Sequence, residues 1–181
     1  MKRVLVTGAT GFIGSSLVKK LLDNGNDVIP IGRNIKEYSS DFIRNNLVNI
    51  DLSSEKLPDF GKIDCVCILA SKQPFKEDEW DEYYKINSKQ IFHFLNMNID
   101  QLIYISSTSV NLINSIPSPQ NYYGLSKALG EKFIQIGNYF FSQASIIRFP
   151  SVMGVNHNGG IIHDLKTWIE NEREINLFNR G

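Results

Sequence analysis

The stretch Thr7-Gly8-Ala9-Thr10-Gly11-Phe12-Ile13-Gly14 decides how this chain folds, because it joins a β-branched run to an apolar-periodic one. Residues 2–7 are typical of a short buried strand, and residues 12–24 carry apolar side chains at helical spacing. Gly25 follows, where a glycine commonly ends a helix. The glycines between the two runs permit a tight reversal of the backbone. The segment therefore predicts a strand–turn–helix unit.

Strand and helix patterns alternate along the rest of the chain. Strand-like runs occupy residues 27–31, 47–50, 63–70, 101–106 and 143–149, and helix-like runs occupy residues 81–98, 122–139 and 159–171. This alternation predicts right-handed crossovers and a parallel sheet covered by helices on both faces. We therefore expect a doubly wound α/β fold, in which ligands bind at the carboxyl ends of the strands. An unpatterned loop at residues 111–121 and a last short strand at residues 175–178 complete the expected elements.

The composition is that of an ordinary globular protein. The 181 residues suffice for one domain, and 42% of them are hydrophobic and 21% charged. Nineteen basic and nineteen acidic residues give a formal net charge of zero, which does not favour nucleic-acid or membrane-surface binding. No apolar run is long enough to span a bilayer, and Thr7 and Gly8 interrupt the apolar start too early for a signal peptide. We expect a cytoplasmic protein without nucleic-acid or membrane partners.

The cysteines and histidines give two smaller expectations. Cys65 and Cys67 are two residues apart in an apolar run, and we expect them to be buried free thiols that point to opposite faces of a strand. His93, His157 and His163 show no metal-ligand spacing, so we expect no metal site.

The glycine turn also predicts a dinucleotide site. Gly11 allows the backbone to approach a pyrophosphate, Gly14 allows the helix to pack near the sheet, and the helix N-terminus attracts phosphate. The spacing Gly-x-x-Gly-x-x-Gly resembles the extended short-chain dehydrogenase/reductase family, the epimerase/dehydratase group. The cofactor-binding residues expected from this segment are Gly8, Thr10, Gly11, Phe12, Ile13 and Gly14.

The end of the second strand indicates which dinucleotide binds. No acidic residue that could accept from a ribose 2′-hydroxyl follows residues 27–31, whereas Arg33 supplies a planar cation suited to a 2′-phosphate, with Lys36 nearby. This pattern favours NADP over NAD. The alternative is that Arg33 is an ordinary solvated loop residue.

The resemblance extends the cofactor site to later strand ends. It implies that Asp51 binds the adenine amino group and that Leu52 packs on the ring, although Asp51 can equally cap the turn before Ser53. It also implies that Asn87 braces a neighbouring strand, the alternative being a plain polar residue on a helix. Further cofactor contacts are expected from Leu69, Ala70, Ser71, Lys127 and Phe149.

A tyrosine and a lysine at helical spacing are the candidate catalytic pair. Of seven tyrosines, only Tyr123 has a lysine, Lys127, four residues later, so both side chains can point into one cleft. A free phenol has a pKa of about 10, which a nearby ammonium lowers, so that the phenol can exchange a proton while hydride moves. The alternative is a surface pair on a helix. The segment Tyr123-Gly124-Leu125-Ser126-Lys127 closely resembles the corresponding segment of the family, and this resemblance implies a catalytic role.

A hydroxyl upstream of this pair completes the expected site. The run Ile105-Ser106-Ser107-Thr108-Ser109-Val110 resembles the segment in which the family places a Ser or Thr against the substrate oxygen. Alignment on Val110 selects Ser107, with Thr108 as the second choice. Thr108 and Ser109 also stand where sugar-nucleotide dehydratases carry an Asp-Glu pair, which argues against a dehydratase.

The resemblance implies hydride transfer at a secondary alcohol or ketone of a nucleotide sugar. Arg33 favours a 4-keto reductase, and an epimerase is the other option; a non-catalytic NADP-binding redox regulator is the alternative from a different class. We expect residues 1–181 to form an NAD(P)-binding Rossmann domain that ends at the start of the substrate lobe, at about residues 155–181, with most of that lobe missing. Such a piece should bind cofactor weakly and show little turnover. It should also self-associate, a homodimer being one option, or depend on further residues, unless residues 111–121 close the site themselves.

Overall fold

The computed structural model describes residues 1–36, 39–53, 56–74, 79–113, 118–154 and 161–171. The chain divides into two compact units, Met1–Pro150 and Ser151–Gly181. Helix α5 (Ile161–Glu170) is the described element of the second unit and matches the helix expected at residues 159–171. The short strand expected at residues 175–178 lies outside the described residues.

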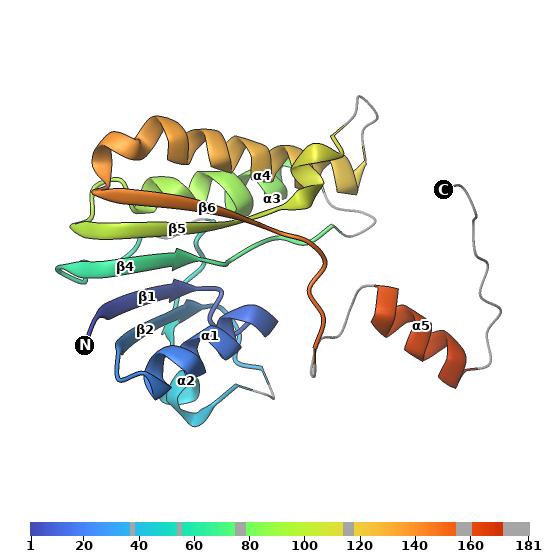
Figure 1. Cartoon of the computed structure of the whole chain (residues 1–181), viewed down its shortest axis with the longest axis horizontal. Helices are drawn as coiled ribbons and strands as arrows, with labels where there is room; N and C mark the ends of the chain where they lie inside the picture. The colour runs from blue at the N-terminus through green and yellow to red at the C-terminus, as the bar shows by residue number, and fades with distance from the viewer. Residues whose placement is uncertain (37–38, 54–55, 75–78, 114–117, 155–160, 172–181) are drawn as a thin grey trace. The chain divides into compact units, whose positions relative to one another are not determined.

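Six parallel strands form the sheet of the first unit, in the order β3-β2-β1-β4-β5-β6 (Figure 1). The chain runs outward from β1 to β3, returns to the centre for β4, and runs outward again on the other side. This arrangement confirms the doubly wound α/β fold. The strands are β1 (Arg3–Thr7), β2 (Asp27–Gly32), β3 (Val48–Asn49), β4 (Ile63–Ile68), β5 (Ile99–Ser107) and β6 (Gln143–Phe149).

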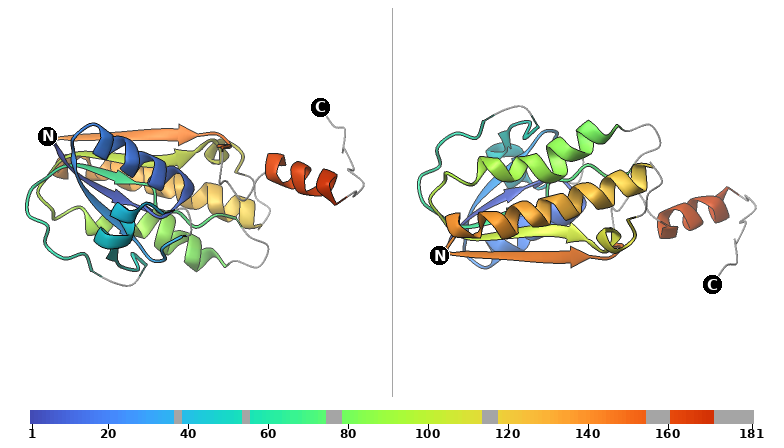
Figure 2. Two further views of the ribbon diagram at one scale, coloured as in Figure 1. Left: turned by 90° about the horizontal axis from the view of Figure 1, so that it is seen from below. Right: turned by 90° about the horizontal axis from the view of Figure 1, so that it is seen from above.

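Helices cover both faces of the sheet, as Figures 1 and 2 show: α1 (Phe12–Asp23) and α2 (Asp41–Asn46) lie on one face, and α3 (Trp80–Tyr83) and α4 (Pro119–Ile136) on the other. Strand β1 contributes to both layers, because successive side chains alternate between the faces. Val4 and Val6 pack in the cluster with α1, whereas Leu5 packs in the cluster with α4. All three are at most 4% exposed, so β1 is the centre of the core.

Cys65 and Cys67 correct one expectation. Both are free and buried, as expected, but they lie on the same face of β4, with their Sγ atoms 4.0 Å apart. Residues two apart on a strand share a face, so the expectation of opposite faces was wrong. Burial and the neighbouring thiol raise the pKa of Cys67 far above its usual range, the hydrogen bond with Cys65 being the larger cause.

The region expected to be one helix at residues 81–98 is irregular. After α3 the chain forms a π-helical turn, η1 (Tyr84–Ser88), and a 3₁₀ turn, η2 (Lys89–His93), and β5 already begins at Ile99. The helix period is broken where buried side chains of this region bind other parts of the chain: Asn87 binds the backbone of Lys72, and Ser88 binds the backbone of Ser126. Tertiary hydrogen bonds therefore override the local helical pattern.

The expected loop at residues 111–121 is shorter than predicted. A 3₁₀ turn, η3 (Thr108–Asn111), follows β5, and α4 begins at Pro119, where the Ser118 side chain caps it by accepting from the Asn121 amide. Helix α4 ends at Ile136 and is followed by the 3₁₀ turn η4 (Gly137–Phe140), rather than continuing to residue 139. Helix α2, capped by Ser40, was not predicted. None of the helices in the described ranges has the length and apolarity that crossing a bilayer requires.

Candidate active site

The carboxyl ends of β1 and β4 are joined by a buried threonine. Thr7, the last residue of β1, accepts hydrogen bonds at Oγ1 from the backbone amides of Leu69 and Ala70, each at 3.1 Å. These two strands are neighbours in space but lead to helices on opposite faces of the sheet, which is the switch point where α/β proteins bind ligands. The predicted residues Leu69 and Ala70 thus flank the start of the glycine turn.

The glycine turn is shaped by close backbone contacts. Gly8 has a φ of 66°, and the Gly11 amide donates to its carbonyl oxygen at 2.9 Å. A Cβ at Gly8 would lie 2.7 Å from the Ala70 nitrogen, and a Cβ at Gly14 would overlap with the Gly8 carbonyl oxygen. Because the N-cap of α1 is itself a glycine, Gly11, no N-cap side chain occupies the space before the helix.

This turn fits the diphosphate of a dinucleotide. The helix start presents backbone amides and the positive end of its dipole, and the glycines leave room for close approach. Thr10 is buried, and Phe12 and Ile13 are half-buried at the start of α1. The residues of this segment that the sequence predicted are therefore brought together at one strand end.

Arg33 and Asp51, predicted for different parts of the cofactor, pair with each other. Arg33 Nη1 lies 3.4 Å from Asp51 Oδ2, and the Ser53 amide donates to Asp51 Oδ1 at 2.9 Å. Burial raises the pKa of Asp51, but the hydrogen bonds from Ser53 and the Arg33 charge outweigh it, so the pKa is lowered. Asp51 thus caps the turn, as the alternative stated. Leu52 lies in the core, only 5% exposed, and His93 Nε2 is 2.9 Å from its carbonyl oxygen.

Tyr123 and Lys127 are both buried on α4, 9% and 2% exposed, so they are not a surface pair. Lys127 Nζ donates to the Ile105 carbonyl oxygen at 3.0 Å, and it lies 5.1 Å from the centre of the Tyr104 ring and 6.0 Å from that of Tyr123. Burial lowers the pKa of Lys127 to about 7. The lysine can therefore change its charge near neutral pH, within reach of the tyrosine ring.

Ser107 ends β5 beside this pair. Its Oγ accepts from the Ser109 amide and donates to the Ser109 hydroxyl, both at 3.1 Å, whereas Thr108 is exposed. A Cβ at Gly124 would lie 2.7 Å from the Ser109 carbonyl oxygen, so η3 packs tightly against α4 next to Tyr123. The structure thus places the predicted catalytic residues on two elements in contact. Phe149 is paired with Ser107 in the register of β5 and β6.

Asn87 braces the loop after β4, whereas the resemblance implied that it braces a neighbouring strand. Its Oδ1 accepts from the Ser71 hydroxyl at 3.0 Å and the Lys72 amide at 2.9 Å. Its Nδ2 donates to the Lys72 carbonyl oxygen at 3.1 Å and to Ser126 Oγ at 2.9 Å. Ser126 in turn donates to the Tyr123 carbonyl oxygen at 2.8 Å. The loop next to the expected cofactor site is therefore tied to the helix that carries the candidate catalytic pair.

One charged group near the site was not predicted from the sequence. Glu131, one helical turn after Lys127, is buried and accepts from the Ser106 hydroxyl at 2.6 Å and from two nitrogens of Arg148. The signal was available, because a glutamate four residues after the lysine shares its helix face.

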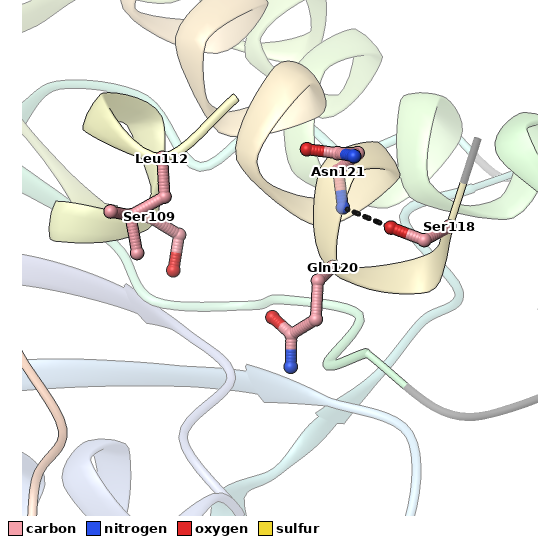
Figure 3. Close-up of a pocket in the computed structure, with 5 residues that line it drawn as sticks. All are labelled: Ser109, Leu112, Ser118, Gln120 and Asn121. Atoms are coloured by element: carbon pink, nitrogen blue, oxygen red, sulfur yellow. Dashed lines mark hydrogen bonds between the residues drawn. The ribbon is translucent and has the colours of Figure 1, made fainter. Parts of the chain in front are cut away.

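A small cavity of about 200 Å³ opens between η3 and the start of α4 (Figure 3). Its walls carry neutral side chains, and Ser109 connects it to Ser107 through their hydrogen bond. The lining residues are Ser109, Leu112, Ser118, Gln120 and Asn121. Among the residues that the structure describes, no group of three or more His, Cys, Asp or Glu could hold a metal ion.

Two curated proteins are similar in sequence to this chain. A provisionally named UDP-glucose 4-epimerase from Methanocaldococcus jannaschii is 29% identical over 83% of this chain and 56% of its own length. An L-arabinose 1-dehydrogenase (NAD(P)(+)) from Haloferax volcanii is 28% identical over 77% of this chain and 61% of its own. The chain thus spans little more than half the length of these relatives.

Solved structures show the same fold. MoeE5, in complex with UDP-glucose and NAD, is 25% identical, with a TM-score of 0.77 over 92% of this chain and 60% of its own. UDP-glucuronic acid 4-epimerase from Bacillus cereus, in complex with UDP-glucuronic acid and NAD, is also 25% identical, with a TM-score of 0.73 over 94% of this chain and 64% of its own. The sequence model of the NAD dependent epimerase/dehydratase family matches residues 4–181. With a glycine turn at the switch point, a buried Tyr–Lys pair and a match of this length, the chain belongs to the NAD dependent epimerase/dehydratase family.

Proposed function

We propose that this chain is the nucleotide-binding part of an enzyme that transfers hydride at a secondary alcohol or ketone of a nucleotide sugar, as a 4-keto reductase or an epimerase. The observation that carries the proposal is the burial of Tyr123 and Lys127 on one face of α4, against the end of β5. MoeE5 and the Bacillus cereus epimerase were each solved in complex with a UDP-sugar and NAD, which supports the substrate class.

Three residues share the chemistry in this proposal. Tyr123 gives a proton to, or takes one from, the substrate oxygen. Ser107 donates a hydrogen bond to the same oxygen once its hydroxyl hydrogen turns from Ser109 Oγ to the substrate. Lys127, when charged, holds its ammonium 6.0 Å from the centre of the Tyr123 ring, where it stabilises negative charge that develops on the phenol oxygen during proton transfer. A bound nicotinamide ring would supply or accept the hydride. Because burial lowers the pKa of Lys127 to about 7, its proton is available for exchange at neutral pH.

For the cofactor we propose NADP as the favoured form, with NAD as the alternative. Arg33 is more than half exposed, and Asp51 holds one of its nitrogens, which leaves the rest of the guanidinium to face a 2′-phosphate. In the same proposal, Asp51 and Leu52 lie near the adenine, and Gly8, Thr10, Gly11, Phe12, Ile13 and Gly14 hold the diphosphate. Leu69, Ala70, Ser71, Lys127 and Phe149 line the nicotinamide side.

The proposed activity needs more than the first compact unit. Residues from about 155 onward would begin the substrate lobe, which would supply most contacts to the sugar nucleotide. We propose that the whole protein works in the cytoplasm and that, without the lobe, its nucleotide-binding part self-associates. Light scattering on the 181-residue chain tests the last point, and a monodisperse monomer would contradict it.

Replacement of Tyr123 by phenylalanine tests the function. In the full-length enzyme, Tyr123→Phe should keep cofactor affinity and lower turnover of a nucleotide sugar by roughly 10²–10⁴-fold, because only the proton-carrying hydroxyl is lost. Tyr122→Phe is the matched control, since that ring packs beside Trp80 and Tyr83. Equal turnover in wild type and Tyr123→Phe would refute the assignment. Tight cofactor binding without turnover of any sugar nucleotide would instead favour a redox-sensing regulator.

A further inference from the structure

The ion pair of Glu131 and Arg148 has no role in the chemistry above, although its carboxylate is buried. Glu131 on α4 is 5% exposed, and Arg148 on β6 donates to it twice, from Nε to Oε1 at 2.8 Å and from Nη2 to Oε2 at 2.6 Å. Two parallel bonds between a guanidinium and a carboxylate fix the relative orientation of both groups. The pair therefore ties helix α4 to strand β6.

The same carboxylate also holds strand β5. Ser106 Oγ donates to Glu131 Oε1 at 2.6 Å, and one residue earlier the Ile105 carbonyl oxygen accepts from Lys127 at 3.0 Å. Lys127 and Glu131 are one helical turn apart, so they leave α4 on the same face. Both residues that directly precede Ser107 are thus bound by α4.

Arg148 extends this contact to the turn that follows β5. Its remaining nitrogen, Nη1, donates to Asn111 Oδ1 at 3.2 Å, and Asn111 is the last residue of η3. The same turn contains Ser109, which exchanges two hydrogen bonds with Ser107. Ser107 is therefore fixed from the strand before it and from the turn after it, and Glu131 and Arg148 are bound to both.

We propose that Glu131 and Arg148 are positioning residues that hold the end of β5 and η3 so that Ser107 keeps its place beside Tyr123 and Lys127. The inference rests on the proposed function, which assigns the chemistry to those three residues. The hydrogen bonds from Arg148 outweigh the effect of burial and lower the pKa of Glu131, so the carboxylate is charged at neutral pH. The two side chains therefore form an ion pair at neutral pH.

The test removes both charges together. Loss of Arg148 alone would leave a buried carboxylate without its cation, which often unfolds a protein, whereas removal of both partners is tolerated far better. The test variant is therefore Glu131→Gln with Arg148→Met, and Arg148→Lys is the conservative single variant. Arg3→Met is the matched control, because Arg3 pairs with Asp27 at 3.2 Å at the opposite end of the sheet.

Two readouts are measured on the full-length enzyme. The first is the Cε resonance of Lys127 in protein labelled with ¹³C-lysine, which is assigned by its loss in Lys127→Met. This resonance reports the position of the Ile105 carbonyl group of β5 relative to the Lys127 ammonium. The second is the set of kcat, KM for a UDP-sugar and Kd for cofactor. The double variant should shift the Lys127 resonance and lower kcat about 10–100-fold while KM and Kd change about twofold at most. Arg148→Lys should recover part of kcat.

An unchanged Lys127 resonance in the double variant would overturn the inference, and so would an equal loss of kcat in Arg3→Met. A parallel loss of kcat and cofactor affinity would also overturn it, since that result marks general damage to the fold. If the wild type turns over no nucleotide sugar, the proposed function fails instead, because the resonance tests the pair without catalysis.

Discussion

Lys127 donates a hydrogen bond from its ammonium to the carbonyl oxygen of Ile105, 3.0 Å away, with only 2% of its surface exposed. A lysine in this position is held by one strand and surrounded by aromatic rings, so most of its hydration is lost on folding. The site therefore carries a cost in stability that depends on pH.

The free energy of unfolding should reveal this cost. Because burial lowers the pKa of Lys127 from 10.5 to about 7, the unfolded chain binds one more proton than the folded chain between those pH values. The contribution of Lys127 to the free energy of unfolding therefore rises with pH between about 7 and 10.5, by up to about 1.4 kcal/mol per pH unit.

Denaturant unfolding of wild type and Lys127→Met from pH 7.5 to 9.5 measures the effect. The difference in stability between the two should grow in favour of wild type by roughly 2–3 kcal/mol over this range. Lys19→Met, at an exposed position on α1, is the control and should follow wild type throughout. Parallel curves for wild type and Lys127→Met would show that the ammonium is not desolvated in the folded protein.

Cofactor preference should depend on Arg33. Arg33→Ala should weaken NADP binding roughly 10–100-fold, since a charge-assisted hydrogen bond contributes about 1.5–3 kcal/mol, and should leave NAD binding nearly unchanged. Titration of both cofactors into both proteins measures this. Arg3→Ala, which breaks an ion pair at the other end of the sheet, is the control. Equal wild-type affinities for the two cofactors would refute the preference.

Gly14 should be required for cofactor binding. In Gly14→Ala, the new Cβ overlaps with the Gly8 carbonyl oxygen, so α1 must move away from the turn that would hold the diphosphate. We expect cofactor affinity to fall at least about tenfold, as the helix N-terminus no longer faces the phosphates. Gly25→Ala serves as the control: its φ of 73° costs stability, about 1 kcal/mol, at a site without contacts to the turn. Equal cofactor affinity in both variants would contradict the assignment.

Asn87 should contribute more to the free energy of unfolding than a side chain with a single hydrogen bond. Asn87→Ala removes hydrogen bonds to Ser71, to both backbone groups of Lys72 and to Ser126. Each buried group left without a partner costs about 1–3 kcal/mol, so we expect a loss of roughly 2–4 kcal/mol in denaturant unfolding. Asn46→Ala, which removes one exposed hydrogen bond to Phe42, should cost less than about 0.5 kcal/mol. Similar losses in the two variants would show that the Asn87 contacts are not maintained in solution.

The elements that could be predicted are those whose local pattern agrees with their tertiary setting. Strand β6 (Gln143–Phe149) has the predicted bounds, and α1 follows directly from the glycine turn. The start of α4 was placed too late although Ser118 and Pro119 form a recognisable cap and first turn.

The irregular turns η1 and η2 could not be predicted from the local pattern. Apolar side chains in this region recur at helical spacing. The backbone nevertheless departs from a regular helix where Asn87 and Ser88 form hydrogen bonds with the loop after β4 and with α4. The pairing of Arg33 with Asp51 is likewise a property of two strand ends that are distant in sequence. Contacts of this kind can be predicted only once the order of the strands in the sheet is known.

The two halves of the sheet meet only where β1 pairs with β4, beginning with Val4 opposite Cys65. Gly8 and Ala70 belong to different halves, so the close contact between them forms only when this long-range pairing is made. Pairings between distant segments are slow steps in folding, because the intervening chain must first be confined. A ligand that binds at this seam recognises the finished sheet and no earlier intermediate, so the rate at which binding capacity appears during refolding should report the joining of the two halves.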